Sequence, residues 1–367
     1  MGRHARPWAS GVRIGFFGAW DAGYPRNRIL RAGLVAAGAE VVDLRVRERR
    51  VVFRYPRLVM EYARAPRLDA LFVPAFRHKD MPLARWLAGR VPVVFDPLVS
   101  RWDTLVEDWA IHATDSLQAK WNRSIDRWAL RSAQAVLCDT WAHGRLFSEL
   151  GARPESLHRI PVGAEQRFFD LAGPEDSVIV EVLYVGGFLP LHGVPTLIDA
   201  LAELQREDSS MPEYRVRLVG RGIQVDVARQ QAERRALRHV VFEGPRPYAE
   251  LPAVMATSHI VLGAFGASAK AGRVVPHKVW QGLAAGRAVL SGDGDGLREW
   301  FRDGVEILSV PRDDARALAA ALGRLIRDAA LRRELGRAGS ARARQLGTPA
   351  QLGRELFEVF EAVVRAS

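Results

Sequence analysis

Cysteine, lysine and long apolar runs are all scarce in this chain of 367 residues. The single cysteine, Cys138, excludes an internal disulfide framework and fits a reducing compartment, so we expect a cytoplasmic protein. No apolar run approaches the roughly 18 residues that a membrane-spanning helix needs. Nine scattered histidines and one cysteine offer no spacing typical of a metal site, so we expect neither a metal nor another cofactor.

The charge balance is strongly basic, with 53 Lys and Arg against 42 Asp and Glu. An arginine bias in an alanine-rich chain says little about partners by itself, and no recognised binding motif accompanies it, so we expect no nucleic-acid partner. Residues 45–67 differ because arginines are interleaved there with large apolar side chains such as Phe53, Leu58 and Met60. This pattern suits an anionic membrane surface, which would be a peripheral position at the inner face of the plasma membrane. It suits a solvated strand and helix of the fold equally well.

Length and hydrophobic patterning predict an α/β protein of two domains. With 48% apolar and 26% charged residues the composition is globular, and the chain is too long for one compact core. Continuous apolar runs, such as 12–18 and 178–187, alternate with helical patterns, as is typical of parallel sheets covered on both faces. The segment 171–177 gathers Gly, Pro and acidic residues and marks the junction. We expect two doubly wound, Rossmann-like domains facing across a cleft, over 1–170 and 171–345, and a C-terminal helix over 346–367 that packs back towards the first domain.

The stretch KAGRVVPHKVWQGLAAG, residues 270–286, contains the predicted start of a helix. Pro276 suits the first helical position, since its missing N–H would be unpaired there. Gly286 suits the left-handed residue that ends a helix, so we expect a helix from about Pro276 to Ala285. Val279 and Leu283 can then turn inward.

Cations gather at this helix start. Lys278 shares a helix face with Gln281, and Lys270 and Arg273 precede them closely. A helix N-terminus and a set of cations are two independent means of holding an anion, so we expect a diphosphate here, with Gln281 within reach of ribose hydroxyls. The alternative is a solvated helix start with incidental cations.

Glycine-containing loops follow several predicted strands of the second half. One loop carries Gly187 and His192, and another carries Gly220 and Arg221. Glycine lets the backbone approach a ligand closely, although it is also common turn chemistry after a strand. Their order within one predicted domain favours a ligand site formed by Gly187, His192, Gly220 and Arg221 together with the cations.

These motifs resemble a known family. The ordered set G-G-F-L-P-L-H-G, L-V-G-R-G, V-V-F-E-G, the 270–286 box and D-G-V-E-I-L-S-V-P is similar to the donor domain of family 4 glycosyltransferases with the GT-B fold. The first domain fits through its glycine loop and through 136–169. The resemblance implies transfer of a sugar from a nucleotide diphosphate donor, with retention and without a catalytic metal. It also implies that the second domain holds the nucleotide and that cations stabilise the departing diphosphate.

The sequence departs from the family pattern at several positions. The family commonly has Arg and Lys in its first glycine loop, where this chain has Gly187 and His192. The family often has two glutamates, where this chain has Arg273 and Gln281. We therefore expect Lys270, Arg273 and Lys278 to take over the diphosphate, and we expect Gln281 to bind ribose as a neutral group.

The first domain offers one catalytic candidate. The family often has a histidine at the end of a strand near the reacting sugar, and Asp96 stands at that place here. Asp96 could contact the donor sugar or take a proton from the acceptor hydroxyl, and it could equally cap a turn before Pro97. Arg26 and Arg28, after the first glycine loop, are candidates for the diphosphate or are surface cations.

We therefore predict a glycosyltransferase that moves a sugar from a nucleotide sugar to a glycan, lipid or other envelope-type acceptor. The alternative is a non-catalytic GT-B relative that binds a glycan or a partner protein. A dinucleotide-dependent oxidoreductase is excluded, because Gln224 and Val225 fail the G-x-G-x-x-G pattern that LVGRG begins.

Overall fold

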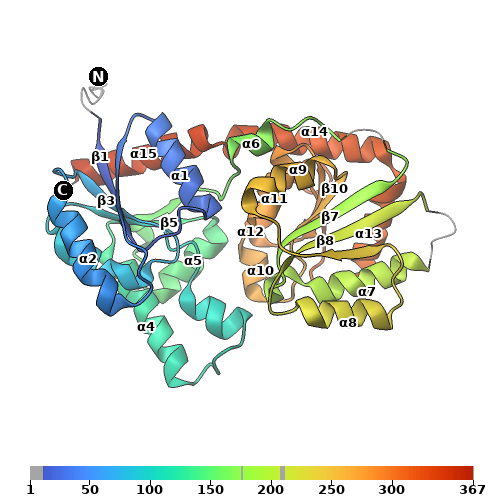
Figure 1. The fold of residues 1–367 in the computed structure, drawn as a ribbon, viewed down its shortest axis with the longest axis horizontal. Coiled ribbons are helices and arrows are strands. Elements are labelled where there is room, and N and C mark those ends of the chain that lie inside the picture. The colour runs from blue at the N-terminus through green and yellow to red at the C-terminus, as the bar shows by residue number, and fades with distance from the viewer. Residues whose placement is uncertain (1–10, 175–176, 207–210, 367) are drawn as a thin grey trace.

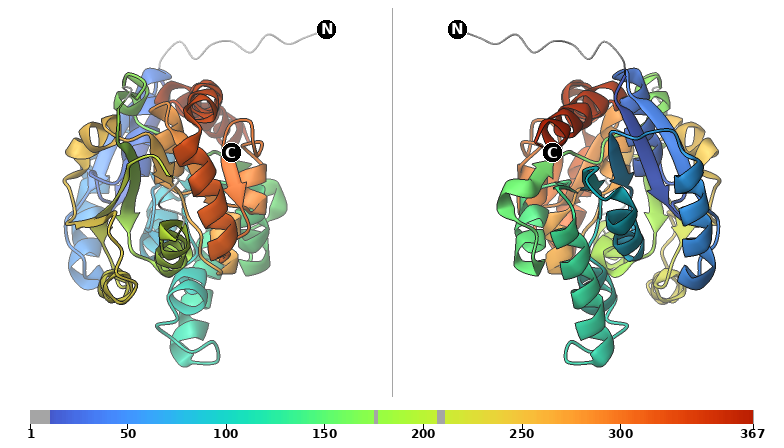
Figure 2. Two further views of the ribbon diagram at one scale, coloured as in Figure 1. Left: turned by 90° about the vertical axis from the view of Figure 1, so that its right-hand side faces the viewer. Right: turned by 90° about the vertical axis from the view of Figure 1, so that its left-hand side faces the viewer.

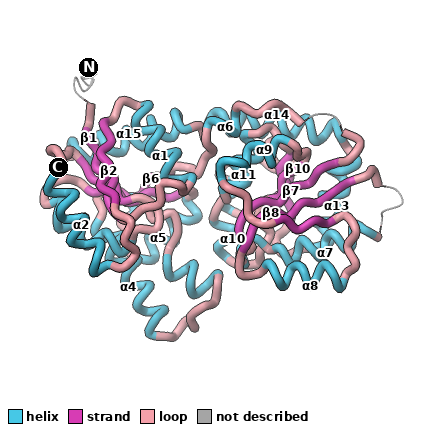
Figure 3. The backbone as a smooth tube through the Cα atoms, viewed as in Figure 1, coloured by secondary structure: helices cyan, strands magenta, loops and turns pink. Residues whose placement is uncertain are grey.

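The structure is a computed structural model, which describes residues 11–174, 177–206 and 211–366. It has two lobes, each built on its own sheet (Figures 1 and 3). The expected junction at 171–177 includes residues 175 and 176, which lie outside the described residues. Over the described ranges, no helix is both long enough and apolar enough to cross a membrane.

The N-terminal domain is built on a parallel six-stranded sheet in the order β2-β1-β3-β4-β5-β6. The strands are β1 (Arg13–Gly18), β2 (Glu40–Arg45), β3 (Ala70–Val73), β4 (Val93–Phe95), β5 (Ala135–Cys138) and β6 (Leu157–Arg159). The helices are α1 (Pro25–Ala36), α2 (Val51–Arg64), η1 (His78–Asp80), α3 (Met81–Ala88), the π-helix η2 (Asp103–Asp108), α4 (Leu117–Ser132), α5 (Trp141–Leu150), η3 (Pro154–Ser156) and α6 (Gln166–Phe169).

The C-terminal domain has a parallel six-stranded sheet in the order β12-β11-β10-β7-β8-β9. The strands are β7 (Val180–Gly187), β8 (Tyr214–Arg221), β9 (Val240–Glu243), β10 (Ile260–Leu262), β11 (Ala288–Gly292) and β12 (Leu308–Val310). The helices are η4 (Pro190–His192), α7 (Val194–Gln205), α8 (Val225–Arg234), η6 (Tyr248–Glu250), α9 (Leu251–Ala256), α10 (Ala269–Arg273), α11 (His277–Ala284), α12 (Asp295–Arg298), α13 (Ala315–Arg327), α14 (Ala329–Leu346) and α15 (Pro349–Arg365).

The continuous apolar runs of the sequence form the buried strands of both sheets, which confirms the predicted α/β architecture. Strands β3, β4 and β5 are buried along their whole length, as expected for parallel strands covered on both faces. The sequence analysis missed β6, whose three residues are only half-buried at the sheet edge. Since all strand pairs are parallel, the carboxyl ends of the strands in each sheet share one edge.

The last two helices run across both lobes (Figure 1). Helix α14 packs on α11 and β11 of the C-terminal domain, and α15 packs on α1 of the N-terminal domain. The α1–α15 contact depends on two glycines: a Cβ added at Gly353 would lie 2.0 Å from the carbonyl oxygen of Gly33. The helix backbones therefore touch, and any side chain at Gly353 forces them apart.

We expect Gly353→Ala to destabilise the protein by about 1–3 kcal/mol, the usual cost of overpacking a close contact. The measurement is chemical unfolding at equilibrium. Glu358→Ala, on the exposed face of the same helix, is the control and should stay within about 0.5 kcal/mol of the parent chain. Equal stability of the two variants would contradict this account of the α1–α15 contact.

Candidate active site

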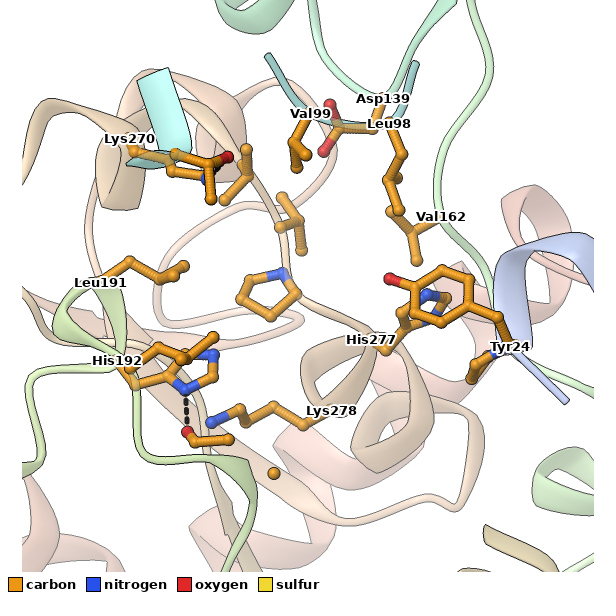
Figure 4. A pocket seen from close by; sticks show the side chains of 18 of the residues that line it. Tyr24, Leu98, Val99, Asp139, Val162, Leu191, His192, Lys270, His277 and Lys278 are labelled. Atoms are coloured by element: carbon orange, nitrogen blue, oxygen red, sulfur yellow. Dashed lines mark hydrogen bonds between the residues drawn. The ribbon is translucent and has the colours of Figure 1, made fainter. Parts of the chain in front are cut away.

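A cavity of about 600 Å³ lies between the two domains (Figure 4). The N-terminal domain contributes mostly apolar side chains with one carboxylate and one arginine, including Tyr24, Phe76, Leu98, Val99, Arg101, Leu105, Trp109 and Asp139. The C-terminal domain contributes apolar residues such as Leu189 and Val275 and a polar group that includes Gly186, Gly187, His192, Tyr248, Lys270, His277, Lys278 and Gln281. The cavity therefore joins a mostly apolar wall to a mixed wall that carries two lysines and backbone polar groups.

Helix α11 places Lys278 and Gln281 in this cavity. The helix begins at His277, and Pro276 is the extended residue before it (φ −63°, ψ 154°), so the prediction that Pro276 opens the helix is wrong by one position. Gly286 has φ +69°, as predicted for the residue after the helix. Val279 and Leu283 are fully buried on the inner face, also as predicted.

Lys278 is a buried cavity cation that no described carboxylate neutralises. Its side chain points towards the loop that carries His192 (Figure 4), and its Nζ lies 3.8 Å from the centre of the Tyr184 ring. Among the described residues, no hydrogen-bond partner reaches this Nζ, although Lys278 is only 4% exposed. Burial lowers the pKa of Lys278 well below its ordinary value. A buried ammonium without a partner is costly unless an anion binds it.

The β7 loop is shaped around Lys278. A Cβ added at Gly186 would lie 3.5 Å from the Lys278 Nζ, and Gly186 has φ +140°, which side chains rarely adopt. The Gly187 carbonyl accepts hydrogen bonds from the Tyr184 hydroxyl and from Nδ1 of His192. Glycine thus keeps the space beside the lysine open, and two side chains fix the position of the next carbonyl.

His192 fixes the loop and adds no positive charge to it. Burial, together with the nearby Lys278, lowers the pKa of His192 well below its ordinary value, so the ring is neutral. With Nδ1 donating to Gly187, the second ring nitrogen is an acceptor. His192 lines the cavity as predicted, but it does not replace the missing family cation of this loop.

Lys270 and Arg273, which the sequence also predicts to bind the diphosphate, already have an acidic partner. Lys270 lines the cavity and its contact with a diphosphate stays a prediction, whereas Arg273 lies outside the cavity lining. Both point at Asp103, a buried carboxylate of η2 in the N-terminal domain: Arg273 donates to its Oδ1, and the Lys270 Nζ lies 3.9 Å from its Oδ2. Lys270 also donates to Oγ1 of Thr104 at 2.6 Å. These contacts close the interface between the domains, because a buried carboxylate needs a partner of opposite charge.

Gln281 keeps a polar group in the cavity. Its Nε2 donates to the Tyr248 hydroxyl at 3.0 Å, and the Arg167 guanidinium lies 4.6 Å from the centre of the Tyr248 ring. The predicted contact between Gln281 and ribose stays a prediction.

Gly220 and Arg221 are not part of the cavity lining, contrary to the prediction from their glycine loop. A Cβ at Gly220 would lie 1.9 Å from the Gly186 carbonyl oxygen, and one at Gly222 would lie 2.4 Å from the Phe188 nitrogen. These glycines let β8 approach β7 closely, and Arg221 is exposed.

Asp96, the predicted catalytic residue, is paired inside the N-terminal domain and is not part of the lining. Its Oδ2 accepts from Nε of Arg26 at 2.8 Å, and both side chains are at most 1% exposed. Arg26 also donates to the carbonyls of Ile160 and Pro161. The ion pair therefore ties helix α1 to β4 and to the segment after β6. Arg26 is fully buried and is not part of the cavity lining, and Arg28 pairs with Glu165.

Asp139 is the carboxylate that faces the cavity, and the sequence analysis missed it. It directly follows β5 and lies beside Leu98 and Val99 (Figure 4). Its Oδ1 is 2.7 Å from Nδ1 of His143, one turn into α5. Its position in the sequence could have indicated it, because Asp139 directly follows a buried strand just as Asp96 does.

Two residues of the apolar wall have a strained backbone. Phe76 has φ +66° and Leu98 has φ +58°, conformations uncommon for residues other than glycine. They follow β3 and β4, and the Phe76 nitrogen contacts the Pro97 carbonyl at 3.4 Å. Strain of this kind is typical of functional sites, and here it delivers two large apolar side chains into the cavity.

No group of three or more His, Cys, Asp or Glu side chains in the described part of the chain could hold a metal ion. A metal-independent reaction stays a prediction that follows from the family resemblance.

Solved structures with the same architecture cover nearly the whole chain. HepE of Anabaena, in complex with UDP and glucose, has a TM-score of 0.73 and 18% identity over 96% of this chain and 100% of that one. Sucrose-phosphate synthase of Thermosynechococcus elongatus has a TM-score of 0.72 and 17% identity over 98% and 100%. A glycosyltransferase of Rickettsia africae has a TM-score of 0.68 and 12% identity over 98% and 100%. The likeness shows the GT-B fold.

No curated protein sequence matches the chain. Two family models match it, one for each domain. Residues 9–163 match the glycosyl transferase 4-like domain, and residues 180–328 match the glycosyl transferases group 1. Because both domains are matched and the whole chain has the GT-B architecture, the chain belongs to the family 4-like glycosyltransferases.

Proposed function

We propose that this glycosyltransferase binds the diphosphate of a nucleotide sugar at Lys278. The observation that carries the proposal is the buried Nζ of Lys278, which no described residue neutralises and which faces the inter-domain cavity beside Gly186 and Gly187. A diphosphate would supply the missing negative charge and would accept hydrogen bonds from backbone amides at the start of α11, which no side chain caps. HepE was solved with UDP and with UDP-glucose, which supports a nucleotide sugar as the ligand.

Lys278 would act mainly in the transition state. As the bond to the sugar breaks, the diphosphate gains charge, so a preorganised ammonium at this position lowers the barrier more than it stabilises the bound donor. Gln281 would contact the ribose hydroxyls. Retention at the sugar and independence from a metal follow from the family resemblance, and we include both in the proposal.

Asp139 would receive the acceptor hydroxyl. It is the carboxylate of the lining, and a positioned carboxylate can take a proton from an attacking hydroxyl. The surrounding wall of Phe76, Leu98 and Val99 favours an acceptor with an apolar portion. Among glycan, lipid and other envelope-type acceptors, this wall supports the lipid class.

The alternative is a GT-B relative that binds a glycan or a partner protein without catalysis. The pairing of Lys270 and Arg273 with Asp103 favours it, because two cations of the expected phosphate site are occupied. Hydrolysis of a nucleotide sugar in the absence of an acceptor separates the two functions, since a non-catalytic relative would release no nucleotide.

We expect UDP, GDP, ADP or dTDP to raise the melting temperature of the parent chain, and we expect Lys278→Met to abolish that rise. A ligand at about 100 times its dissociation constant stabilises a protein by about 2.7 kcal/mol, which differential scanning fluorimetry resolves easily. Donor hydrolysis should fall by about 100-fold or more in the variant, since one preorganised group at the developing charge is removed.

Lys79→Ala removes an exposed lysine outside the cavity and serves as the matched control, with an unchanged nucleotide response. A parent chain whose melting temperature responds to none of the four nucleotides would overturn the proposed donor site.

We expect the two cavity lysines to affect the ligand-free fold in opposite directions. The lowered pKa of Lys278 means that the unfolded chain binds more protons than the folded chain between the lowered and the ordinary pKa, so this group makes stability rise with pH in that window. Lys278→Met should therefore raise the melting temperature at neutral pH, by about 2–4 °C for each kcal/mol gained, and should flatten its rise towards alkaline pH.

Lys270→Met should instead lower stability by about 1–3 kcal/mol, because Thr104 and Asp103 lose a buried partner. Destabilisation of both variants would show that Lys278 is not an uncompensated charge.

We expect Asp139→Asn to lower activity and Asp96→Asn to lower stability. Asp139→Asn should keep the nucleotide-induced rise in melting temperature and lower donor turnover with an acceptor by about 100-fold or more, as for loss of a general base. Asp96→Asn should lose about 3–5 kcal/mol of stability, because Arg26 is left as a buried charge without its anion. If the Asp139→Asn variant stays active while the Asp96→Asn variant is stable but inactive, the catalytic residue is Asp96 and not Asp139.

A further inference from the structure

Helix α4 projects beyond both lobes. In Figures 1 and 2 the teal helix and the turn before it extend below the rest of the molecule in every view. Its inner face packs through residues that include Ala119, Asp126, Ala129 and Leu130, and it contacts α3 and α5. The opposite face is therefore turned to the surroundings.

This outer face carries a stripe of large apolar side chains. Leu117 is 79% exposed, Trp121 is 65% exposed and Trp128 is 45% exposed. At about 100° per residue, the three directions fall within about 40° of one another around the helix axis. Trp86 on the neighbouring helix α3 is 73% exposed as well. Exposed tryptophans at helical spacing are unusual on a surface in contact with water alone.

Four cations accompany the stripe. Lys120, Arg123, Arg127 and Arg131 are all exposed, and no ion pair with a described residue neutralises any of them. The Arg123 guanidinium lies 5.3 Å from the centre of the Trp102 ring. Asp126, the carboxylate of this helix, is turned inward, where it accepts hydrogen bonds from the Ser100 hydroxyl and from two backbone amides. The outer face of α4 therefore combines apolar side chains with positive charge and presents no carboxylate, and Asp115 is the exposed carboxylate of the turn before it. We call Trp86, Leu117, Trp121, Trp128 and these four cations the α3–α4 surface.

We propose that the α3–α4 surface docks the protein on an anionic lipid bilayer. Tryptophan prefers the boundary between headgroups and acyl chains, because its ring is apolar and its N–H is polar. Arginine and lysine extend their charged ends to lipid phosphates while their stems stay with the apolar side chains. Single-sign charge complements an anionic bilayer better than a protein surface of mixed charge.

The surface differs from the one that the sequence suggested at 45–67. Helix α2 does expose Val52, Phe53 and Met60. Two of its cations, however, are already paired: Arg54 contacts Asp80 at 2.6 Å, and Arg57 contacts Glu48. On α2 itself this leaves Arg64 as the cation without an ion pair among the described residues, whereas α4 has four, although exposed arginines also precede α2 at 47, 49 and 50.

The α3–α4 surface is connected to the inter-domain cavity along the chain. Thr104 and Leu105 of η2, and Trp109 after it, line the cavity, and residues 110–116 then lead to α4. Docking through α4 would hold the apolar cavity wall next to the lipid. This consequence rests on the proposed function and its lipid-type acceptor, whereas docking itself does not.

The test is co-sedimentation of the full chain with vesicles of phosphatidylcholine alone or of phosphatidylcholine with phosphatidylglycerol. We expect binding to the anionic vesicles only, and weaker binding as salt increases. The double variant Trp121→Ser, Trp128→Ser should bind at least about tenfold more weakly, because two interfacial rings are lost. Replacing Lys120, Arg127 and Arg131 by Gln should remove the preference for anionic lipid.

The matched control is Val52→Ser, Phe53→Ser on α2, which removes exposed apolar side chains and leaves α4 intact. Equal binding to both vesicle types, loss of binding only in the α2 variant, or no binding by the parent chain would overturn the proposal. A change of oligomeric state in the α4 variant without any effect on vesicle binding would assign the surface to self-association instead. The nucleotide-induced rise in melting temperature should be unchanged in the same variants. Its absence in the parent chain would contradict the proposed donor site without contradicting the docking proposal.

Discussion

Asp103 lies fully buried between the two domains, where it faces both Lys270 and Arg273. A carboxylate in this position is stable only while its cationic partners stay in place, so the contact holds the N-terminal π-helix against α10 of the C-terminal domain. The cavity walls are brought together by the same contact. The contact that holds the two domains together therefore also occupies two cations that could otherwise bind phosphate.

Lys278 is left in a different electrostatic state as a consequence. It is as buried as Lys270, yet no carboxylate meets it, and Gly186 keeps the space beside it open. The fold carries an unfavourable charge here, which is the usual mark of a site built for a ligand and not for stability. The glycines at the end of β8 support that arrangement indirectly, since they let the chain lie close against Gly186 and Phe188, on either side of Gly187.

The two domains contribute different groups to the cavity, and this difference suits a reaction between unlike partners. The C-terminal wall offers cationic and hydrogen-bonding groups, whereas the N-terminal wall offers strained apolar residues around Asp139. The apolar wall is also connected along the chain, through η2, to the projecting helix α4. The proposed acceptor site and the proposed docking surface therefore lie on neighbouring segments of the chain.

The sequence by itself determined the two parallel sheets, the helix that carries Lys278 and Gln281, and the family, because each depends on local periodicity and on the order of motifs. Only the tertiary structure decided which charged groups are available. Asp96 and Asp139 both end buried strands, and Lys270 and Lys278 both flank one helix start, so the sequence gives no means of telling the members of each pair apart. Asp96 is paired with Arg26, which lies 70 residues away in the sequence. Lys270 faces Asp103, which lies 167 residues away. Ion pairs between distant segments have no local signature, since they depend on how whole domains meet.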